Sequence, residues 1–523
     1  MSALPLLRTI GDGFLLRWLL LLSAVLFLLL LGSLLLFRRK GIQLWQVYIP
    51  VVLSLGLCYS FVLPPLSAPD EVVHYIGAYE LSSRILGRPS PLYDSEGQLL
   101  IRAEDTFIDD WQGDGDPDNA TVVGRHLTRE LYEELHRRGF GAGEESGYHF
   151  TLQLPVETTR LAYLFPALGF SAARLLGLGG FGLLYFGRWM NLLFFTMLGG
   201  MAVRRTPVGR ELFFGVSLLP MLLELASSLS YDCFLLGLSF YLTAVMLDLA
   251  LSKPCVTGRD VLTLSLLAVL LSPCKIVYSL LFLGCFLIPP RKFRSKRHYL
   301  GCILLIGTLM LGAILWSNLP ALLRYVFPAA GTTHSVDWVE NAASAETYDL
   351  QELLKTPIIL LKILRNTVQI QGGYYLYTMA GGALGHLEEG LGLGLPGLWF
   401  FYGLLLLLNL FGSAAEPRIP LFRRLLCFLS VLSVSVLLLV SMLTAYTPLR
   451  TDYALGVQGR YFLPLLPLFA MSFHGRGEAL LLQRGGSFGR MQGFGASALL
   501  FTELLGNAVL LLLLFLRISL RTL

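Results

Sequence analysis

A run of twenty residues without a charged side chain, from Trp18 to Phe37, most constrains what this chain can fold into. At about 1.5 Å of rise per residue, a helix of that length covers the roughly 30 Å hydrocarbon core of a bilayer. The run is too long for a secretory signal, and the basic residues Arg38, Arg39 and Lys40 follow it where a signal would have a small-residue cleavage site. The sequence therefore predicts an integral membrane protein.

The composition extends this prediction to the whole chain. Of its 523 residues, 55% are hydrophobic and only 14% are charged, whereas a soluble domain has roughly 25% charged residues. None of the seven cysteines has CxxC spacing, and the sequence contains no HExxH, GxSxG or Walker motif. We therefore expect no disulfide framework and no zinc site, and we disfavour a soluble enzyme, a metalloprotease, an α/β-hydrolase and a P-loop pump.

The distribution of charge predicts which segments face the cytoplasm. Away from the long polar segment 66–160, the bases fall in short clusters between apolar runs: 38–40, 204–210, 253–259, 291–297, 418–424 and 476–490. The positive-inside rule places these clusters on the cytoplasmic side. Segment 66–160 holds 18 of the 35 acidic residues and only 8 of the 40 bases, so we expect it to lie outside as an acidic loop.

Together, the apolar runs and the charge pattern predict an all-α, polytopic helical bundle with about twelve spans. The predicted spans are roughly 14–37, 42–64, 182–203, 211–230, 233–252, 260–272, 276–290, 299–318, 393–412, 425–445, 460–474 and 494–516. Segments 161–178 and 356–379 are apolar but carry basic residues, and we expect them to be amphipathic helices at the membrane surface. This count puts both termini outside.

These predictions divide the chain into five regions. They are the first two transmembrane helices (1–65), an acidic extracytoplasmic loop with interfacial helices (66–181), a transmembrane bundle (182–318), a second extracytoplasmic loop with an interfacial helix (319–392) and the C-terminal transmembrane helices (393–523).

Three separated turns are predicted to bring polar residues to the outer face. Segment 260–290 has positive charge at both ends and must cross the membrane an even number of times, so Pro273 should turn the chain and Lys275 should lie outside. The same reasoning places Asp232 and Arg460 at outer helix ends. Because an unpaired cation is costly in apolar surroundings, Lys275 and Arg460 either extend to the membrane surface or clamp an anion such as a lipid-linked phosphate.

The sharpest local motif is PPLSAPDEVVH at residues 64–74. Pro69 suits the first turn of a helix, and Asp70 and Glu71 would then lie at its positive N-terminal end. His74 follows three and four residues later, where both carboxylates can reach the imidazole. A plain helix cap with an exposed histidine is the alternative. Charges beside a Pro-Pro turn at the membrane surface favour a functional role.

The rest of the acidic loop, including Asp105 and segment 109–118, resembles a calcium site in composition only. It lacks the twelve-residue spacing and the closing glutamate of an EF-hand. We therefore expect it to be solvated.

Several segments resemble bacterial membrane proteins of domain-of-unknown-function family 2142, which is related to the GT-C glycosyltransferases. The most specific are the motif Pro-Asp-Glu-x-x-His at 69–74 and Gln-Gly-Arg-Tyr at 458–461; the others are 163–178, 187–193, 219–232, 273–281 and 382–396. The resemblance implies a GT-C-like bundle in the bacterial cytoplasmic membrane with a large first outer loop. One departure is His386, which stands where the family pattern often has a tryptophan.

The resemblance also implies a chemistry, namely inverting transfer of a sugar from a polyprenyl-phosphate donor to an extracytoplasmic glycan acceptor of the cell envelope. The implied site comprises catalytic residues Asp70, Glu71 and His74, phosphate-binding residues Lys275 and Arg460, and substrate-binding residues Asp232, Gln458 and Tyr461. By this analogy, Asp70 and Glu71 are also candidate ligands for a divalent ion, Mg²⁺ or Mn²⁺.

Two other functions fit the same residues. A transporter or flippase of lipid-linked sugars would also place cations in a polar cavity, although the sequence shows no internal repeat of the kind that builds many transporters. A non-catalytic protein of envelope assembly would use the acidic loop as a docking surface. For the transferase, the expected partners are the polyprenyl-phosphate sugar donor, the extracytoplasmic glycan acceptor and membrane lipid, and no nucleic acid is expected.

Overall fold

The computed structural model describes residues 13–88, 98–108, 127–130, 132–133, 139–140, 147–151, 158–326, 335–336, 345–388, 390–410, 416–449, 451–474 and 492–521. Its α-helices are α2 (Gly13–Arg38), α3 (Leu44–Val62), α4 (Glu71–Leu86), α6 (Leu164–Leu175), α7 (Phe181–Arg205), α8 (Arg210–Ser217), α9 (Pro220–Ala226), α10 (Asp232–Leu251), α11 (Gly258–Leu271), α12 (Lys296–Val326), α13 (Leu350–Lys355), α14 (Pro357–Ala380), α15 (Leu395–Leu410), α16 (Leu421–Ala445), α17 (Leu466–Met471) and α19 (Gln492–Ser519).

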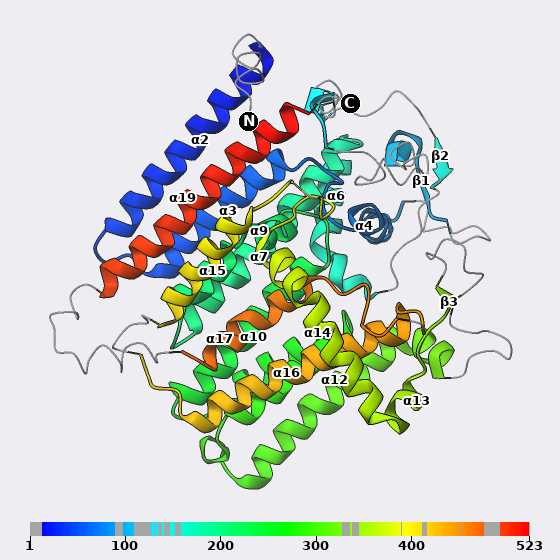
Figure 1. Cartoon of the computed structure of the whole chain (residues 1–523), viewed down its shortest axis with the longest axis vertical. Coiled ribbons are helices and arrows are strands. Elements are labelled where there is room, and N and C mark those ends of the chain that lie inside the picture. Colours follow the sequence, from blue (N-terminus) through cyan, green and yellow to red (C-terminus); the bar gives the residue numbers. More distant parts are fainter. Residues whose placement is uncertain are drawn as a thin grey trace.

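Shorter elements connect these helices. The 3₁₀ helices are η1 (Ala103–Ile108), η3 (Arg160–Tyr163), η4 (Ile276–Leu287), η5 (Pro290–Lys292) and η6 (Gly459–Leu465). Strand β1 (Leu100–Arg102) pairs antiparallel with β2 (Tyr148–Phe150), and β3 (Ser335–Val336) pairs antiparallel with β4 (Ala345–Glu346). The described chain is thus a helical bundle with two small hairpin-like pairings in its loops (Figure 1).

Seven of the described helices, α2, α3, α7, α10, α12, α16 and α19, are long and apolar enough to cross a membrane. The other five predicted spans correspond to shorter or interrupted helices. Segment 211–230 is divided into α8 and α9 because Pro220, at the start of α9, has no backbone N–H for a helical hydrogen bond. Pro464 and Pro467 similarly accompany the division of 460–474 into η6 and α17.

The basic helix ends meet at one face of the bundle. The Arg205 guanidinium, at the end of α7, lies 3.2 Å from Asp248 and 3.0 Å from Asp260, and the Lys253 ammonium lies 2.6 Å from Asp260. Figure 1 shows the start of α2 and the end of α19 at the same end of the molecule as β1 and β2, which belong to the acidic loop.

Part of the acidic loop is folded onto the bundle rather than solvated. The Asp105 side chain is fully buried, and its carboxylate accepts hydrogen bonds from the Tyr79 hydroxyl (2.9 Å), Arg102 Nε (2.7 Å) and the Gly180 N–H (3.0 Å). The expectation of a solvated Asp105 was therefore wrong, because Tyr79 and Gly180, which are distant in sequence, bury it together with the nearby Arg102. Segment 109–118 lies outside the described residues.

Candidate functional site

The turn between α3 and α4 carries unusual backbone geometry. Leu66 and Asp70 both have positive φ, at 66° and 60°. Such conformations are costly for a side chain larger than glycine, and the buried packing of Leu66 compensates. Helix α4 begins at Glu71 with Asp70 as its N-cap residue, so Pro69 precedes the helix instead of occupying its first turn.

Glu71 forms a buried, two-bond ion pair with Arg188 of α7. Arg188 Nε donates to Glu71 Oε1 at 2.7 Å, and Arg188 Nη2 donates to Oε2 at 2.6 Å. The Leu229 N–H adds a bond to Oε1 at 3.0 Å, and the Ala68 N–H adds one to Oε2 at 3.3 Å. Arg188 also donates to the carbonyls of Ser60, Leu63 and Pro64 at the end of α3. The pair therefore joins α3, α4, α7 and the turn after α9.

Sequence reasoning missed Arg188, although a signal was present. Arg188 lies within the apolar segment 187–193, and an arginine in such a position calls for a partner. The identity of that partner could not be inferred, because Glu71 is more than a hundred residues away in the chain.

Four charged side chains from four separate segments form what we call the polar cluster, namely Asp70, Asp232, Lys275 and Arg460. Arg460 Nη2 donates to Asp70 Oδ2 at 2.6 Å. On its other side, Arg460 Nε lies 3.8 Å from Asp232 Oδ2, and Lys275 Nζ lies 3.5 Å from Asp232 Oδ1. The cations and carboxylates thus alternate along the cluster.

The polar cluster is open at one end and has unused bonding capacity at the other. The Asp70 side chain is 52% exposed and that of Lys275 is 25% exposed, whereas that of Arg460 is only 2% exposed. Within the described chain, Arg460 Nε and the buried oxygen Oε1 of Gln458 have no hydrogen-bond partner. Because buried polar atoms without partners are costly, these two atoms leave bonding capacity that a polar ligand could use.

Aromatic rings surround the cations. Lys275 Nζ lies 3.9 Å from the ring centre of Tyr461 and 5.2 Å from that of Tyr231, within the range of cation–π attraction. The Tyr278 hydroxyl donates to the Tyr461 carbonyl at 2.6 Å and holds this part of η6 in place. Lys275 is therefore fixed by packing as well as by Asp232.

His74 lies behind the polar cluster, in contact with rings rather than with carboxylates. Its Nδ1 is 2.9 Å from the Tyr163 hydroxyl, and its ring packs edge-on against Tyr231. The sequence predicts an imidazole within reach of Asp70 and Glu71, but in the structure its side-chain hydrogen bond is to Tyr163. Burial lowers the pKa of His74 to about 4, against an opposing effect of nearby carboxylates. His74 is therefore neutral at pH 7.

Acidification should destabilise the protein through His74. Since the folded pKa, about 4, lies below the ordinary value of 6.5, the stabilising contribution is complete above pH 6.5 and is lost as the pH falls toward 4. The expected slope approaches about 1.4 kcal/mol per pH unit. In thermal unfolding between pH 7 and 4, His74→Gln should show a smaller decrease in unfolding temperature than the parent. Equal decreases would contradict a buried neutral His74.

Asp70 has the opposite electrostatic setting. Partial burial raises the pKa of its carboxyl, but the Arg460 guanidinium outweighs this effect, so the pKa lies below its usual value of 3.8. His74 and His386 add smaller effects in the same direction. Asp70 is therefore a carboxylate at neutral pH, able to accept a proton.

The residues present do not fit a divalent metal held by Asp70 and Glu71. Both Glu71 oxygens are engaged by Arg188, and Asp70 is paired with Arg460. Among the described residues, no group of three or more His, Cys, Asp or Glu side chains is placed to hold a metal ion. The geometry assigns Glu71 to positioning the turn.

The loop after α14 brings His386 near the polar cluster. The Gly385 N–H donates to the buried carboxylate of Glu224 at 2.7 Å, and Arg517 Nη1 donates to the carbonyls of Gly390 and Gly392. These bonds fix the loop between α14 and α15, and the exposed His386 interacts electrostatically with Asp70.

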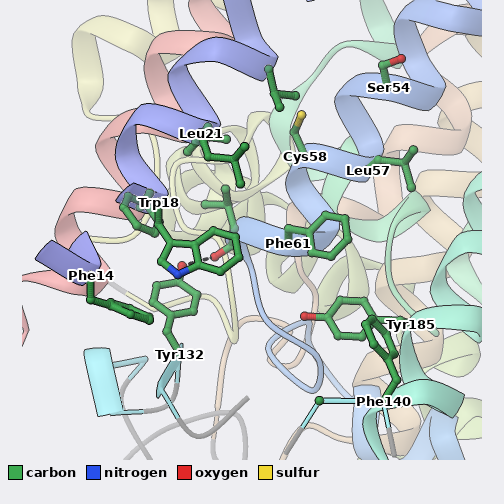
Figure 2. Close-up of a pocket in the computed structure, with 15 residues that line it drawn as sticks. Phe14, Trp18, Leu21, Ser54, Leu57, Cys58, Phe61, Tyr132, Phe140 and Tyr185 are labelled. Atoms are coloured by element: carbon green, nitrogen blue, oxygen red, sulfur yellow. Dashed lines mark hydrogen bonds between the residues drawn. The ribbon is translucent and has the colours of Figure 1, made fainter. Parts of the chain in front are cut away.

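A separate apolar cavity of about 590 Å³ lies between α2 and α3 (Figure 2). It is lined by Phe14, Trp18, Leu21, Leu22, Val25, Ser54, Leu57, Cys58, Phe61, Val62, Tyr132, Gly139, Phe140, Tyr185 and Phe515. Its lining includes no member of the polar cluster. Tyr132 joins it from the acidic loop and donates a hydrogen bond to the Val62 carbonyl.

Comparison with known proteins identifies the family. Residues 53–469 match the family model described as a predicted membrane protein (DUF2142). No curated protein and no solved structure matches the chain. The matched segment includes every residue of the polar cluster together with Glu71 and Arg188. Since the match covers well over half of the sequence, this chain belongs to the DUF2142 family of membrane proteins.

Proposed function

We propose that this protein is a glycosyltransferase of the bacterial cytoplasmic membrane that moves a sugar from a polyprenyl-phosphate carrier to an extracytoplasmic glycan acceptor. The observation that carries the proposal is the polar cluster, in which the exposed Asp70 carboxylate pairs with Arg460, and Asp232 links Arg460 to the second cation, Lys275. A GT-C-like relationship, inferred from sequence resemblance, supports the same activity. The cations suit a phosphate, and the carboxylate suits an acceptor hydroxyl.

The reaction requires one base and one anion site. Asp70 accepts the proton of the acceptor hydroxyl while that oxygen forms a bond to the anomeric carbon of the sugar. The bond between the anomeric carbon and the carrier phosphate breaks, and the phosphate departs with the electron pair. Lys275 and Arg460 stabilise the charge that grows on the phosphate. The leaving group needs no proton, so no separate acid is required.

Substrate binding would also change the basicity of Asp70. In the free protein, Arg460 holds the pKa of Asp70 low, which makes the carboxylate a weak base. A carrier phosphate competes with Asp70 for the guanidinium, and any weakening of the ion pair raises the basicity of Asp70. Asp232 remains between Lys275 and Arg460 and keeps the two cations from repelling each other.

The other predicted site residues take supporting roles in this proposal. Glu71 positions the turn that carries Asp70, and the neutral His74 forms part of the aromatic wall behind it. Gln458 offers its unpartnered oxygen to a sugar hydroxyl, and Tyr461 lies over Lys275 where a ring can also stack on a sugar.

Transport of a lipid-linked sugar is a second candidate because the bundle contains a broken helix. The interruption between α8 and α9 lies inside the bundle, as in transporters whose discontinuous helices form substrate sites. An assay in liposomes separates the two functions. With a labelled polyprenyl-phosphate sugar, a transferase separates the sugar from the carrier when an acceptor is present, whereas a flippase moves the lipid across the bilayer with its mass unchanged.

Replacing Lys275 with methionine should weaken donor use by about 10- to 100-fold, because one charge-assisted contact to phosphate is worth roughly 1.5–3 kcal/mol. The measurement is transfer rate against donor concentration. Lys362→Met, which removes an exposed lysine of α14, is the matched control and should leave the rate unchanged. Equal rates for both variants would remove Lys275 from the anion site.

A further inference from the structure

Outside the polar cluster, an ionisable side chain lies inside the helical bundle. Glu503 of α19 is fully buried, and within the described chain neither of its carboxylate oxygens has a hydrogen-bond partner. It lies near the middle of a helix that is long and apolar enough to span the membrane. Ionisable residues in such positions are rare because their charge is costly to bury, and they mark functional sites by default.

The surroundings of Glu503 are apolar. A Cβ atom added at Gly215 of α8 would lie 3.0 Å from Glu503 Oε2, and Leu405 and Leu408 of α15 meet the same position. Among the described residues, no hydrogen bond or ion pair reaches either carboxyl oxygen of Glu503. A bare carboxylate in these surroundings would cost many kcal/mol, so the neutral acid is the form that the packing accommodates.

The carboxyl lies beside the broken helix. One turn further along α19, Asn507 Nδ2 donates to the Leu218 carbonyl at 2.9 Å, in the interruption between α8 and α9. The same nitrogen donates to the backbone carbonyl of Glu503 at 3.0 Å. Asn507 Oδ1 accepts from the Tyr59 hydroxyl at 2.8 Å. Asn507, which holds the break, therefore lies one helical turn from Glu503 on the same helix.

We propose that Glu503 is a proton-binding site within the membrane, protonated at neutral pH, and that loss of its proton acts on the α8–α9 break. An ionised Glu503 requires a donor, and the Asn507 amide can supply one only by giving up a present bond. Nothing in the proposed sugar transfer uses this group, so the inference stands independently of that function.

Infrared spectroscopy of the full-length protein in lipid nanodiscs tests the protonation directly. The parent should show, at pH 7, a carboxylic acid C=O stretching band that is absent from Glu503→Gln and unchanged in Asp452→Asn, which alters an exposed carboxylate. Raising the pH should remove the band. A parent spectrum identical to that of Glu503→Gln would show that Glu503 is ionised and would overturn the proposal.

Stability and chemical modification give two further readouts. Glu503→Leu removes an unpartnered polar group, so the unfolding temperature of this variant should equal or exceed that of the parent. A clear decrease would mean that the carboxyl makes bonds incompatible with the proposal.

Dicyclohexylcarbodiimide is an apolar reagent that modifies protonated carboxyl groups. One of its nitrogens takes the proton of the carboxylic acid, and its central carbon forms a bond to the carboxyl oxygen. After an oxygen-to-nitrogen shift, mass spectrometry should locate the stable adduct on Glu503 but not on the ionised, Arg188-paired Glu71.

Discussion

Arg188→Met is expected to destabilise the protein by about 3–5 kcal/mol, because it leaves the Glu71 carboxylate buried without a counter-charge. Both side chains of this pair are at most 2% exposed, and the guanidinium also satisfies three carbonyls at the end of α3. The measurement is the unfolding of the detergent-solubilised protein, monitored either in a denaturant titration or as the loss of the monodisperse species on heating.

A matched control is available in the ion pair between Arg84 and Glu80. The Arg84 side chain is 41% exposed, and Arg160 provides Glu80 with a second cation, so Arg84→Met should cost less than about 1 kcal/mol. A double variant, Glu71→Leu with Arg188→Met, removes both charges and should recover part of the lost stability. Equal destabilisation by Arg188→Met and Arg84→Met would contradict the structural role of the buried pair.

Asp70→Asn is expected to lower sugar transfer by about 10²- to 10⁴-fold, the range over which a positioned general base contributes. Asparagine keeps the shape of the side chain but cannot accept the proton of the acceptor hydroxyl. Because the asparagine oxygen can still accept the hydrogen bond from Arg460, and Asp232 remains as a counter-charge, the unfolding temperature should change only slightly. The measurement is turnover of labelled donor by purified protein with acceptor supplied.

The control for this variant is Asp452→Asn, which neutralises an exposed carboxylate whose partner is the Asn366 amide. It should transfer sugar at the parent rate. A purified Asp70→Asn protein that elongates a glycan as fast as the parent would exclude Asp70 as the base, whatever the effect on Lys275 or Arg460 variants.

The sequence by itself determined the class of protein, a helical membrane protein. Charge-free runs such as 18–37 specify membrane helices because a bilayer imposes a minimum apolar length. The basic clusters predict the cytoplasmic ends, and the predicted turn at Pro273 then puts Lys275 at the same face as Asp232 and Arg460. The predicted proximity of Lys275, Asp232 and Arg460 follows from such one-dimensional constraints, because outer helix ends must share one surface.

Only the tertiary structure decided what each of these side chains does. Asp70 and Glu71 are neighbours in the motif, yet one is exposed beside Arg460 and the other is buried against Arg188. Their difference arises from the left-handed turn at Asp70 and from the position of α7, neither of which has a local signature. The same is true of Glu503, since a carboxyl on an apolar helix becomes an isolated acid only when α8 and α15 pack around it. Hydrophobic pattern and charge can bring distant segments to one face, but which side chains then pair depends on three-dimensional packing.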